Sequence, residues 1–179
     1  MILTVGTVRG AKVISRSVDA GQKGHTGILL SVIDDVLKKS ALDVNDVEAV
    51  ALVVGPGSFT GIRIGAATAT AIAQAVGAKR ISVTAFDVLA YNRADVSVAV
   101  EAGHGNLYTA KCSGGKTVST EFVQAQDAKV ENYVFKPASD PADVLAAIAR
   151  EKAEKGEFVS VFEPYYMRKS QAERNRDEI

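Results

Sequence analysis

A glycine-rich bend between an uncharged apolar run and a helix constrains this sequence more than any other feature. The run at 47–54, VEAVALVV, has no charge after Glu48 and predicts a central strand that is buried on both faces. The string GPGSFTG follows at 55–61, and the pattern of 62–76 predicts a helix that ends at Gly77. A buried strand, a tight bend and a helix in this order are typical of α/β proteins.

The rest of the sequence also alternates between strand and helix signals. Residues 2–5 and 12–18 predict an opening hairpin, and apolar residues at helical spacing predict a helix from His25 to Lys39. Further strands are expected at 80–84, 96–101, 107–112 and 117–123, and further helices at 86–91 and 140–154.

The order of elements suggests two units. Both halves open with strands and end in a helix, and the polar stretch at 92–95 is the best boundary between them. We therefore expect an N-terminal lobe at 1–92 and a C-terminal lobe with its tail at 93–179.

Charge and composition exclude several classes of function. The 21 basic and 21 acidic residues give a formal net charge of zero, so no global field draws the chain to nucleic acid or to an anionic membrane. No apolar run approaches the ~20 residues of a membrane span, and the N-terminal segment lacks a basic leader, so we expect a cytoplasmic protein. The lone Cys112 lies in an alternating run and is expected to be a small residue of a sheet.

The glycine-rich bend has two interpretations. Its three glycines let the backbone approach another group, and the N–H groups at the start of the helix can bind a phosphate or carboxylate. Alternatively, the bend is only a tight turn in which Ser58 or Thr60 caps the helix. It is not a Walker A loop, because Ile62 and Arg63 follow Gly61 where a lysine and a Ser or Thr are needed.

The sequence offers no recognisable catalytic or metal-binding set. Its two histidines, His25 and His104, are far apart and do not form a pair on one helical face. We expect His25 to be a solvated or capping residue, since no neighbour would activate it as a base. Neither a serine–histidine–acid set nor a metal site is predicted.

Four segments together resemble the TsaB (YeaZ) family. They are the helix opened by His25, GPGSFTGIRIG at 55–65 with the alanine-rich helix after it, EAGHGNLY at 101–108 and EPYYMR at 163–168. The resemblance implies an α/β fold of the actin-like ATPase (ribonuclease H-like) type, with two lobes of mixed sheet and helices. The chain is short for the family, so the second lobe is expected to be shortened.

The resemblance also implies a function. TsaB-type proteins act as non-catalytic scaffolds or activators of TsaD, the transferase that modifies the tRNA adenosine beside the anticodon with a threonylcarbamoyl group. ATP and metal are then expected on TsaD, with none bound by this chain, and the TsaE ATPase is a further expected partner. A homodimer is expected in isolation, and tRNA is contacted mainly through the partner. Gly57, Ser58 and Arg63 are the residues expected to touch a nucleotide or anion.

The helix at 65–73 has small side chains around most of its circumference. Such a helix can pack closely inside one domain, or it can meet another subunit. The resemblance favours a surface that pairs with itself or with TsaD. The expected interface residues are Ile28, Leu29, Val32, Ile33, Ala66, Ala69, Thr70 and Ala73.

Three departures from the family pattern bear on catalysis. Gly6 stands where an acidic residue usually ends the first strand, His25 lacks its usual downstream glutamate, and Glu101-Ala102-Gly103 replaces an acidic-Ala-Arg pattern. An acid at the first position would hold magnesium or water beside phosphates. Two alternatives remain: a small kinase or ATPase of the same fold, and a stand-alone homodimeric anion-binding module.

Overall fold

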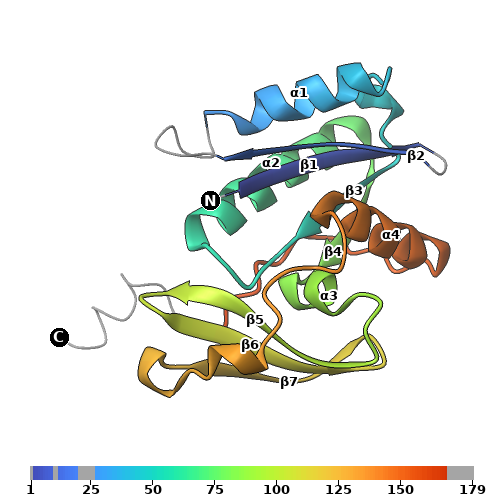
Figure 1. The fold of residues 1–179 in the computed structure, drawn as a ribbon. Helices are drawn as coiled ribbons and strands as arrows, with labels where there is room; N and C mark the ends of the chain where they lie inside the picture. The colour runs from blue at the N-terminus through green and yellow to red at the C-terminus, as the bar shows by residue number, and fades with distance from the viewer. Residues whose placement is uncertain (1, 10–11, 20–26, 169–179) are drawn as a thin grey trace.

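The chain opens with the predicted hairpin, although its first strand is longer than expected. The computed structural model describes residues 2–9, 12–19 and 27–168 (Figure 1). Strand β1 (Ile2–Arg9) pairs antiparallel with β2 (Lys12–Asp19), and Gly6 lies opposite Ser15. The expected position of Gly6 at the end of a strand is therefore wrong, because pairing with β2 continues beyond it to Arg9.

Helix α1 (Leu29–Lys39) packs against this hairpin. It buries Leu29, Val32 and Val36, which recur at the spacing of one helical face. Two lysines lie in its last turn, where positive charge interacts favourably with the negative end of the helix dipole. The expected start at His25 lies outside the described residues. A short 3-10 helix (Val44–Asp46), capped by Asp43, follows α1.

The predicted strand, bend and helix at the centre of the sequence are confirmed. Strand β3 (Ala49–Val53) pairs in parallel with β4 (Lys79–Val83), and α2 (Phe59–Val76) connects them. Helix α2 ends at Gly77, whose φ of 70° is the left-handed conformation that glycine adopts without a steric penalty. The four residues after Ala49 in β3 are half-buried rather than buried, so the prediction of full burial is wrong.

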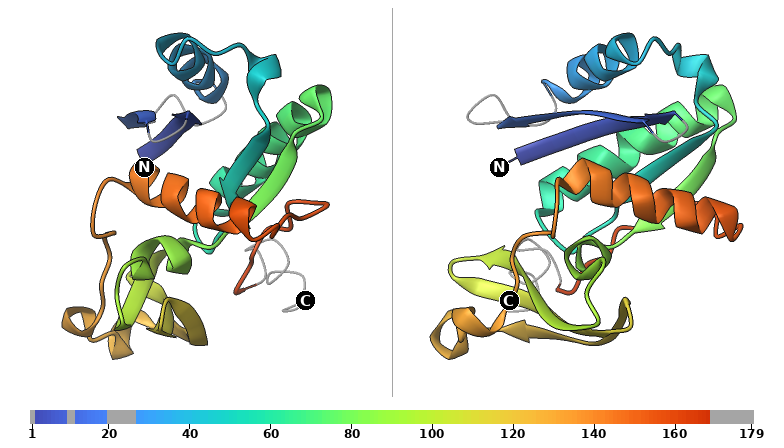
Figure 2. Two further views of the ribbon diagram at one scale, coloured as in Figure 1. Left: turned by 90° about the vertical axis from the view of Figure 1, so that its right-hand side faces the viewer. Right: turned by 45° about the vertical axis from the view of Figure 1, so that its right-hand side comes forward.

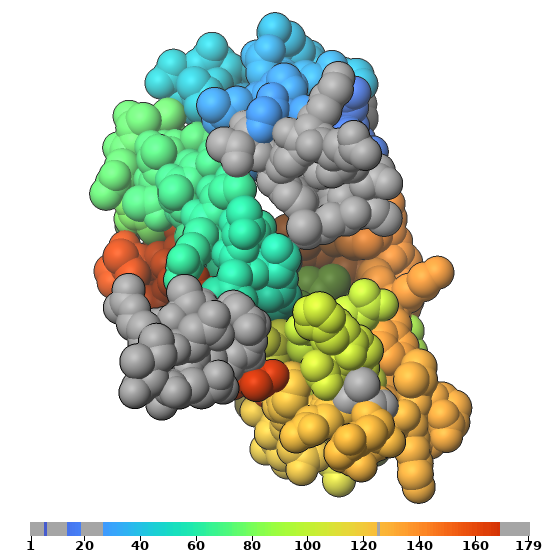
Figure 3. Space-filling model, turned by 90° about the vertical axis from the view of Figure 1, so that its left-hand side faces the viewer, coloured from blue at the N-terminus to red at the C-terminus, as the bar shows by residue number. Residues whose placement is uncertain are grey.

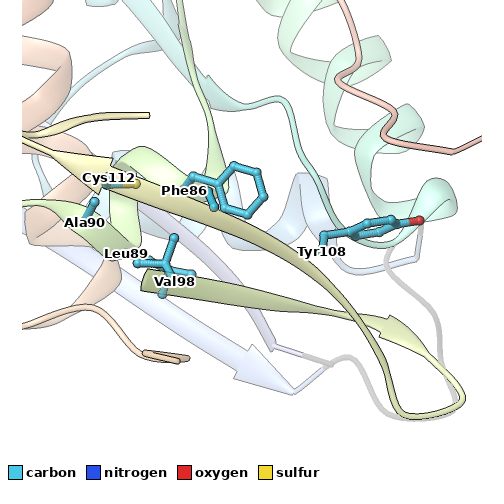
Figure 4. Close-up of a cluster of buried hydrophobic side chains, with 7 residues drawn as sticks. Phe86, Leu89, Ala90, Val98, Tyr108 and Cys112 are labelled. Carbon is cyan, nitrogen blue, oxygen red and sulfur yellow. The ribbon is translucent and has the colours of Figure 1, made fainter. Parts of the chain in front are cut away.

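A second layer is built on an antiparallel sheet. Helix α3 (Ala85–Ala90) leads into β5 (Asp95–Gly103), β6 (Asn106–Ser113) and β7 (Lys116–Val123), paired in that order. Side chains from α3, β5 and β6 form one core cluster, which includes the buried thiol of Cys112 (Figure 4). Short 3-10 helices at Ala125–Asp127 and Val130–Asn132 follow β7.

The turn that joins β6 to β7 is exposed to solvent. The first six residues of β7 are exposed, and only the last two are half-buried. Gly114 and Gly115 form the turn with φ values of 55° and 74°, a conformation that other residues rarely adopt. The Gly114 N–H donates a hydrogen bond to the Ala94 carbonyl at 2.7 Å, so the turn lies beside the start of β5.

Helix α4 (Pro141–Glu154) packs against strands from the first half of the chain. Asp140 caps it, and Val144 and Ile148 join Ile81 and Val83 of β4 in a buried cluster. The helix contacts the strands β1 to β4, so it underlies both the hairpin and the β3–β4 pair. Helix α4, which belongs to the expected C-terminal lobe at 93–179, therefore buries its apolar face against strands from before residue 92.

The hairpin and the β3–β4 pair form two sheets rather than one. They lie side by side over α4, as Figure 2 shows, but no hydrogen bonds join β1 to β3 among the described residues. The described residues also contain no helix with the length and apolar character that crossing a membrane requires. The architecture is thus a mixed α/β arrangement of three small sheets covered by helices.

Candidate functional site

The glycine-rich bend lies directly against the C-terminal segment, although about a hundred residues separate them in sequence. The Tyr165 N–H donates a hydrogen bond to the Val54 carbonyl at 2.8 Å. A Cβ on Gly55 would lie only 2.6 Å from the Tyr165 carbonyl oxygen, and Gly55 has a φ of 121°. Both observations require glycine at this position. We call residues 55–63 and 163–168 together the glycine-loop site.

Ser58 acts as the helix cap that the sequence allowed. Its Oγ accepts a hydrogen bond from the Gly61 N–H at 3.2 Å, and its backbone is extended as expected for a residue that precedes a helix. The capping interpretation is therefore confirmed at Ser58. One of the N–H groups at the start of α2 is consequently already bonded within the chain.

An arginine and two aromatic rings form the exposed part of the glycine-loop site. The rings of Phe59 and Tyr166 stack with centroids 4.6 Å apart and an interplanar angle of 12°. Arg63 Nε donates a hydrogen bond to the Tyr166 hydroxyl at 3.0 Å, and its guanidinium carbon lies 5.6 Å from the centroid of the Tyr166 ring. These contacts fix the direction of the Arg63 side chain on the surface.

The inner residues of the site hold the C-terminal segment to the core. Phe162 is buried in a cluster with Val54, Ala66 and Ala69, and Tyr165 packs edge-on against Phe86 with centroids 6.5 Å apart. The segment after α4 therefore bridges the start of α2 and the start of α3. Of the three expected anion-contacting residues, Ser58 and Arg63 are exposed and Gly57 is half-buried.

Most of the expected interface residues lie below the surface of the chain. Five of the expected residues are buried in the chain's own core: Leu29, Val32, Ala66, Ala69 and Ala73. Ala66 and Ala69 pack in a cluster with Val54 and Phe162. Ile28, Ile33 and Thr70 are half-buried.

A different face of α2 reaches the surface. Arg63, Ala67, Ala71 and Gln74 are exposed and recur at helical spacing, so they form one outer stripe. Figure 3 shows α2 at the surface of the molecule next to α1. We refer to this stripe as the outer face of α2.

The exposed charges of α1 are paired within the chain. The Lys39 ammonium, 3.0 Å from Asp35, and the Arg16 guanidinium, 2.8 Å from it, hold the pKa of that carboxyl below its usual value. A hydrogen bond to Asp34 at 2.6 Å raises the pKa of Lys38. These pairs neutralise one another on the outer side of α1.

The described residues do not assemble any further chemical centre from the predicted candidates. His104 lies in the turn between β5 and β6 with a φ of 53°, and His25 lies outside the described residues. Burial raises the pKa of the Cys112 thiol, which is the opposite of what a nucleophile needs. Within the described part of the chain, no three His, Cys, Asp or Glu side chains group as a metal site would require.

No sequence pattern predicts the roles of Phe59, Tyr165 and Tyr166. Both motifs that carry them were recognised, but no periodicity connects residues that lie so far apart in the sequence. The only available signal was the presence of aromatic residues in two glycine- or proline-containing motifs.

Comparisons with known proteins agree with the family suggested by these motifs. The family model described as TsaD, tRNA N6-adenosine threonylcarbamoyltransferase, matches residues 13–144. The tRNA threonylcarbamoyladenosine biosynthesis protein TsaB of Haemophilus influenzae is 46% identical over 55 residues, which are 31% of this chain and 23% of that protein. The Escherichia coli TsaB protein is 32% identical over 93 residues, covering 49% of this chain and 40% of that protein.

Two further proteins are similar to this chain over a larger share of its length. The uncharacterized protein Rv3421c of Mycobacterium tuberculosis is 31% identical over 129 residues, covering 70% of this chain and 61% of that protein. The chain therefore spans less than two thirds of the length of these curated relatives. The solved structure of YeaZ from Pseudomonas aeruginosa has the same fold, with a TM-score of 0.74 at 20% identity over 93% of this chain and 94% of that chain.

The family match covers the glycine-rich bend of the glycine-loop site, whereas the C-terminal segment at 163–168 lies beyond it. The match also includes the hairpin strand β2, α2 and the antiparallel sheet, whereas Gly6 lies before it. Given the match to most of the chain, the TsaB names of its relatives and the shared fold, the chain belongs to the TsaB (YeaZ) family, within the group that the TsaD family model describes.

Proposed function

We propose that this chain is an accessory subunit in the modification of tRNA adenosine to threonylcarbamoyladenosine. The observation that carries the proposal is the family match over residues 13–144, together with relatives that are named for this biosynthesis. In this proposal the substrate is the adenosine beside the anticodon, and the transfer takes place on a TsaD partner. The zero net charge supports the view that the partner supplies most of the contact with tRNA.

The proposed role is structural and allosteric rather than catalytic. Binding of this chain can shift its partner towards the active conformation if the chain binds that conformation more tightly than the inactive one. ATP and metal are assigned to TsaD, and the TsaE ATPase joins the assembly. In the absence of TsaD, the same surface of this chain pairs with a second copy.

We assign the interface to the outer face of α2 and the adjoining glycine-loop site. Ala67 and Ala71 provide a flat surface that another helix can approach closely. At one end of this surface, Arg63 is held by Phe59 and Tyr166. Arginine and aromatic side chains of this kind are enriched among the residues that dominate binding energy at interfaces.

The fold is proposed to be the duplicated actin-like ATPase (ribonuclease H-like) arrangement with a shortened second lobe. The mixed sheets, the covering helices and the similarity to YeaZ support this assignment. We propose that the division between lobes falls near residue 92, with α4 packed back onto the first lobe.

The experiment is a calorimetric titration of this chain with TsaD from the same organism, followed by modification assays on unmodified tRNA. Ala67→Arg and Ala71→Arg place a long charged side chain in the flat surface while leaving the buried face of α2 unchanged. We expect each to weaken binding by about tenfold or more and to reduce modification in parallel. Val118→Arg is the control, because Val118 is an exposed apolar residue of β7.

The outcomes separate the proposal from its alternatives. Equal affinity of the wild-type chain and both α2 variants would place the interface elsewhere. If TsaD does not bind at all and the chain alone hydrolyses ATP, the small kinase or ATPase becomes the better assignment. Thermal unfolding of each variant shows whether a lost contact reflects the interface or the fold.

A further inference from the structure

A small cavity opens on the face of the antiparallel sheet that lies opposite its core. Successive side chains of a strand point to opposite faces, and Tyr108, Ala110 and Cys112 of β6 belong to the core cluster. Thr109 and Lys111 therefore point to the other face. The cavity on that face has a volume of about 220 Å³ and is lined by polar side chains from all three strands, among them Ser97, Lys111, Ser119 and Glu121.

The segment that follows β7 forms the other wall of the cavity. The Val134 N–H donates a hydrogen bond to the Ser97 carbonyl at 2.9 Å, and the Ala99 N–H donates one to the Val134 carbonyl at 3.0 Å. These bonds hold Asn132 and Tyr133, which line the cavity, beside the edge of β5. The wall and the sheet thus form one hydrogen-bonded unit, and the cavity is preformed as binding sites for small molecules usually are.

Cross-strand neighbours form the floor of the cavity. Ser97, Lys111 and Ser119 lie opposite one another on the three strands, and Thr109 lies opposite Glu121. Lys111 and Glu121 are therefore diagonal neighbours on adjacent strands. The Cβ atoms of such a pair are about 7 Å apart, within reach of long side chains. A positive and a negative group consequently face the same small space.

Both of these charges lack an opposite charge within the chain. No ion pair involves Lys111 or Glu121 among the residues that the structure describes. An ammonium group binds a carboxylate through strong charge-assisted hydrogen bonds, and a carboxylate binds an ammonium group in the same way. A molecule that carries both charges close together can therefore bind both side chains at once.

The remaining side chains of the cavity favour a neutral polar ligand group. Thr109 is only 4% exposed, and its hydroxyl donates to the Glu121 carbonyl at 3.2 Å, so it can still accept a hydrogen bond. The hydroxyls of Ser97 and Ser119 and the amide of Asn132 can both donate and accept. An apolar group would leave these atoms without partners, which costs free energy.

The size of the cavity restricts the ligand further. A volume of about 220 Å³ is that of about seven water molecules in the liquid. Drug-sized ligands and nucleotides need larger pockets. The cavity therefore fits a small molecule that carries two opposite charges and one neutral polar group.

We propose that this cavity binds a free α-amino acid with a hydroxyl or amide side chain. The ammonium group of Lys111 donates to the ligand carboxylate, and the carboxylate of Glu121 accepts from the ligand ammonium group. The ligand side chain bonds to the neutral groups beside Thr109. This inference does not depend on the proposed function, because the cavity contains no residue of α2 or of the glycine-loop site.

The first test measures binding to the full chain through the NMR shifts of its backbone amides. The probes are L-serine, L-threonine, L-asparagine and L-glutamine. We expect at least one of them to cause saturable shifts in β5, β6 and β7. Its N-acetyl derivative and its methyl ester each lack one charge and should bind about tenfold more weakly or worse. The absence of saturable shifts with all four amino acids would overturn the proposal, and so would equal binding of both derivatives.

The second test changes the two charges. We expect Lys111→Gln and Glu121→Gln each to weaken binding of the same amino acid by about tenfold or more, whereas Lys111→Arg should bind more tightly than Lys111→Gln. Lys116→Gln and Glu154→Gln are the matched controls, because both residues are exposed and neither lines the cavity.

Thermal unfolding of every variant accompanies the titrations. We expect the unfolding temperatures of the cavity variants to match those of the controls, because Lys111 and Glu121 are exposed and have no partner to lose. Wild-type affinity in both cavity variants, or an equal loss in the controls, would show that the cavity does not bind amino acids in this way.

Discussion

At the scale of single residues, Gly55 has the clearest structural requirement. We expect Gly55→Ala to lower the free energy of unfolding by about 1–3 kcal/mol, because it adds backbone strain at a φ of 121° and meets the Tyr165 carbonyl. Gly57→Ala is the matched control, since nothing lies within 4 Å of its added Cβ. Urea unfolding of both variants measures the difference, and equal losses would mean that the contact with Tyr165 has no energetic role.

Cys112 gives a prediction about pH. Burial raises its pKa above the usual 9.0, so folding favours the neutral thiol. This contribution is fully present below the unfolded pKa and is lost as the pH rises through the folded pKa. We expect the stability of the wild-type chain to fall more steeply above about pH 9 than that of Cys112→Ala. Parallel pH profiles for the two proteins would contradict this account.

The sequence predicted some of these residues by type but not by contact. Ser58 was one of two capping candidates, because a serine immediately before a helix satisfies its first N–H groups wherever it occurs. The need for glycine at position 55 depends instead on a carbonyl of Tyr165. A contact between such distant residues leaves no local pattern in the sequence.

At the scale of elements, the C-terminal segment has an inner and an outer tyrosine. Tyr165 is half-buried against Phe86, whereas Tyr166 is 37% exposed and stacks on Phe59. We expect Tyr165→Ala to cost about 2 kcal/mol or more, through lost packing, and Tyr166→Ala to cost less. Chemical denaturation measures both, and a larger loss for Tyr166→Ala would contradict the assignment of Tyr165 to the core.

The existence and order of the elements could be predicted, but the buried side of α2 could not. Helix α1 has a distinct apolar face, so the spacing of Leu29, Val32 and Val36 predicts which side of the helix is buried. Helix α2 has small residues almost all round, so no stripe separates Ala69, which is buried, from Ala67, which is exposed. For this reason the sequence could not show that Ala66, Ala69 and Ala73 are buried within the chain.

At the scale of the whole molecule, α4 connects the two sheets of the first half. We expect Ile148→Ala to destabilise the protein by about 3 kcal/mol, because Ile148 is 7% exposed in the cluster with Ile81 and Val83. Glu154→Gln at the exposed end of α4 should change stability by less than about 0.5 kcal/mol. We also expect the hairpin and β3 to unfold in a single transition, because α4 packs against both. Separate transitions would show that α4 does not couple them.

The packing of α4 and the separation of the sheets could not be read from the sequence. An amphipathic helix shows which of its faces is buried but not which strands receive it. Similarly, the apolar run of β3 predicts a buried central strand, whereas the residues after Ala49 are only half-buried in the fold. Both questions are decided by contacts between segments that are distant in the chain.

The glycine turn between β6 and β7 has a practical consequence for experiments on this protein. Because Gly114 and Gly115 lie at an exposed tip, a short labelling sequence inserted between them would leave the core cluster of the antiparallel sheet intact. The tip belongs to a different sheet from β3 and contains no part of α2. A fluorescent reporter at this position can therefore follow assembly while the proposed interface on the outer face of α2 keeps its natural sequence.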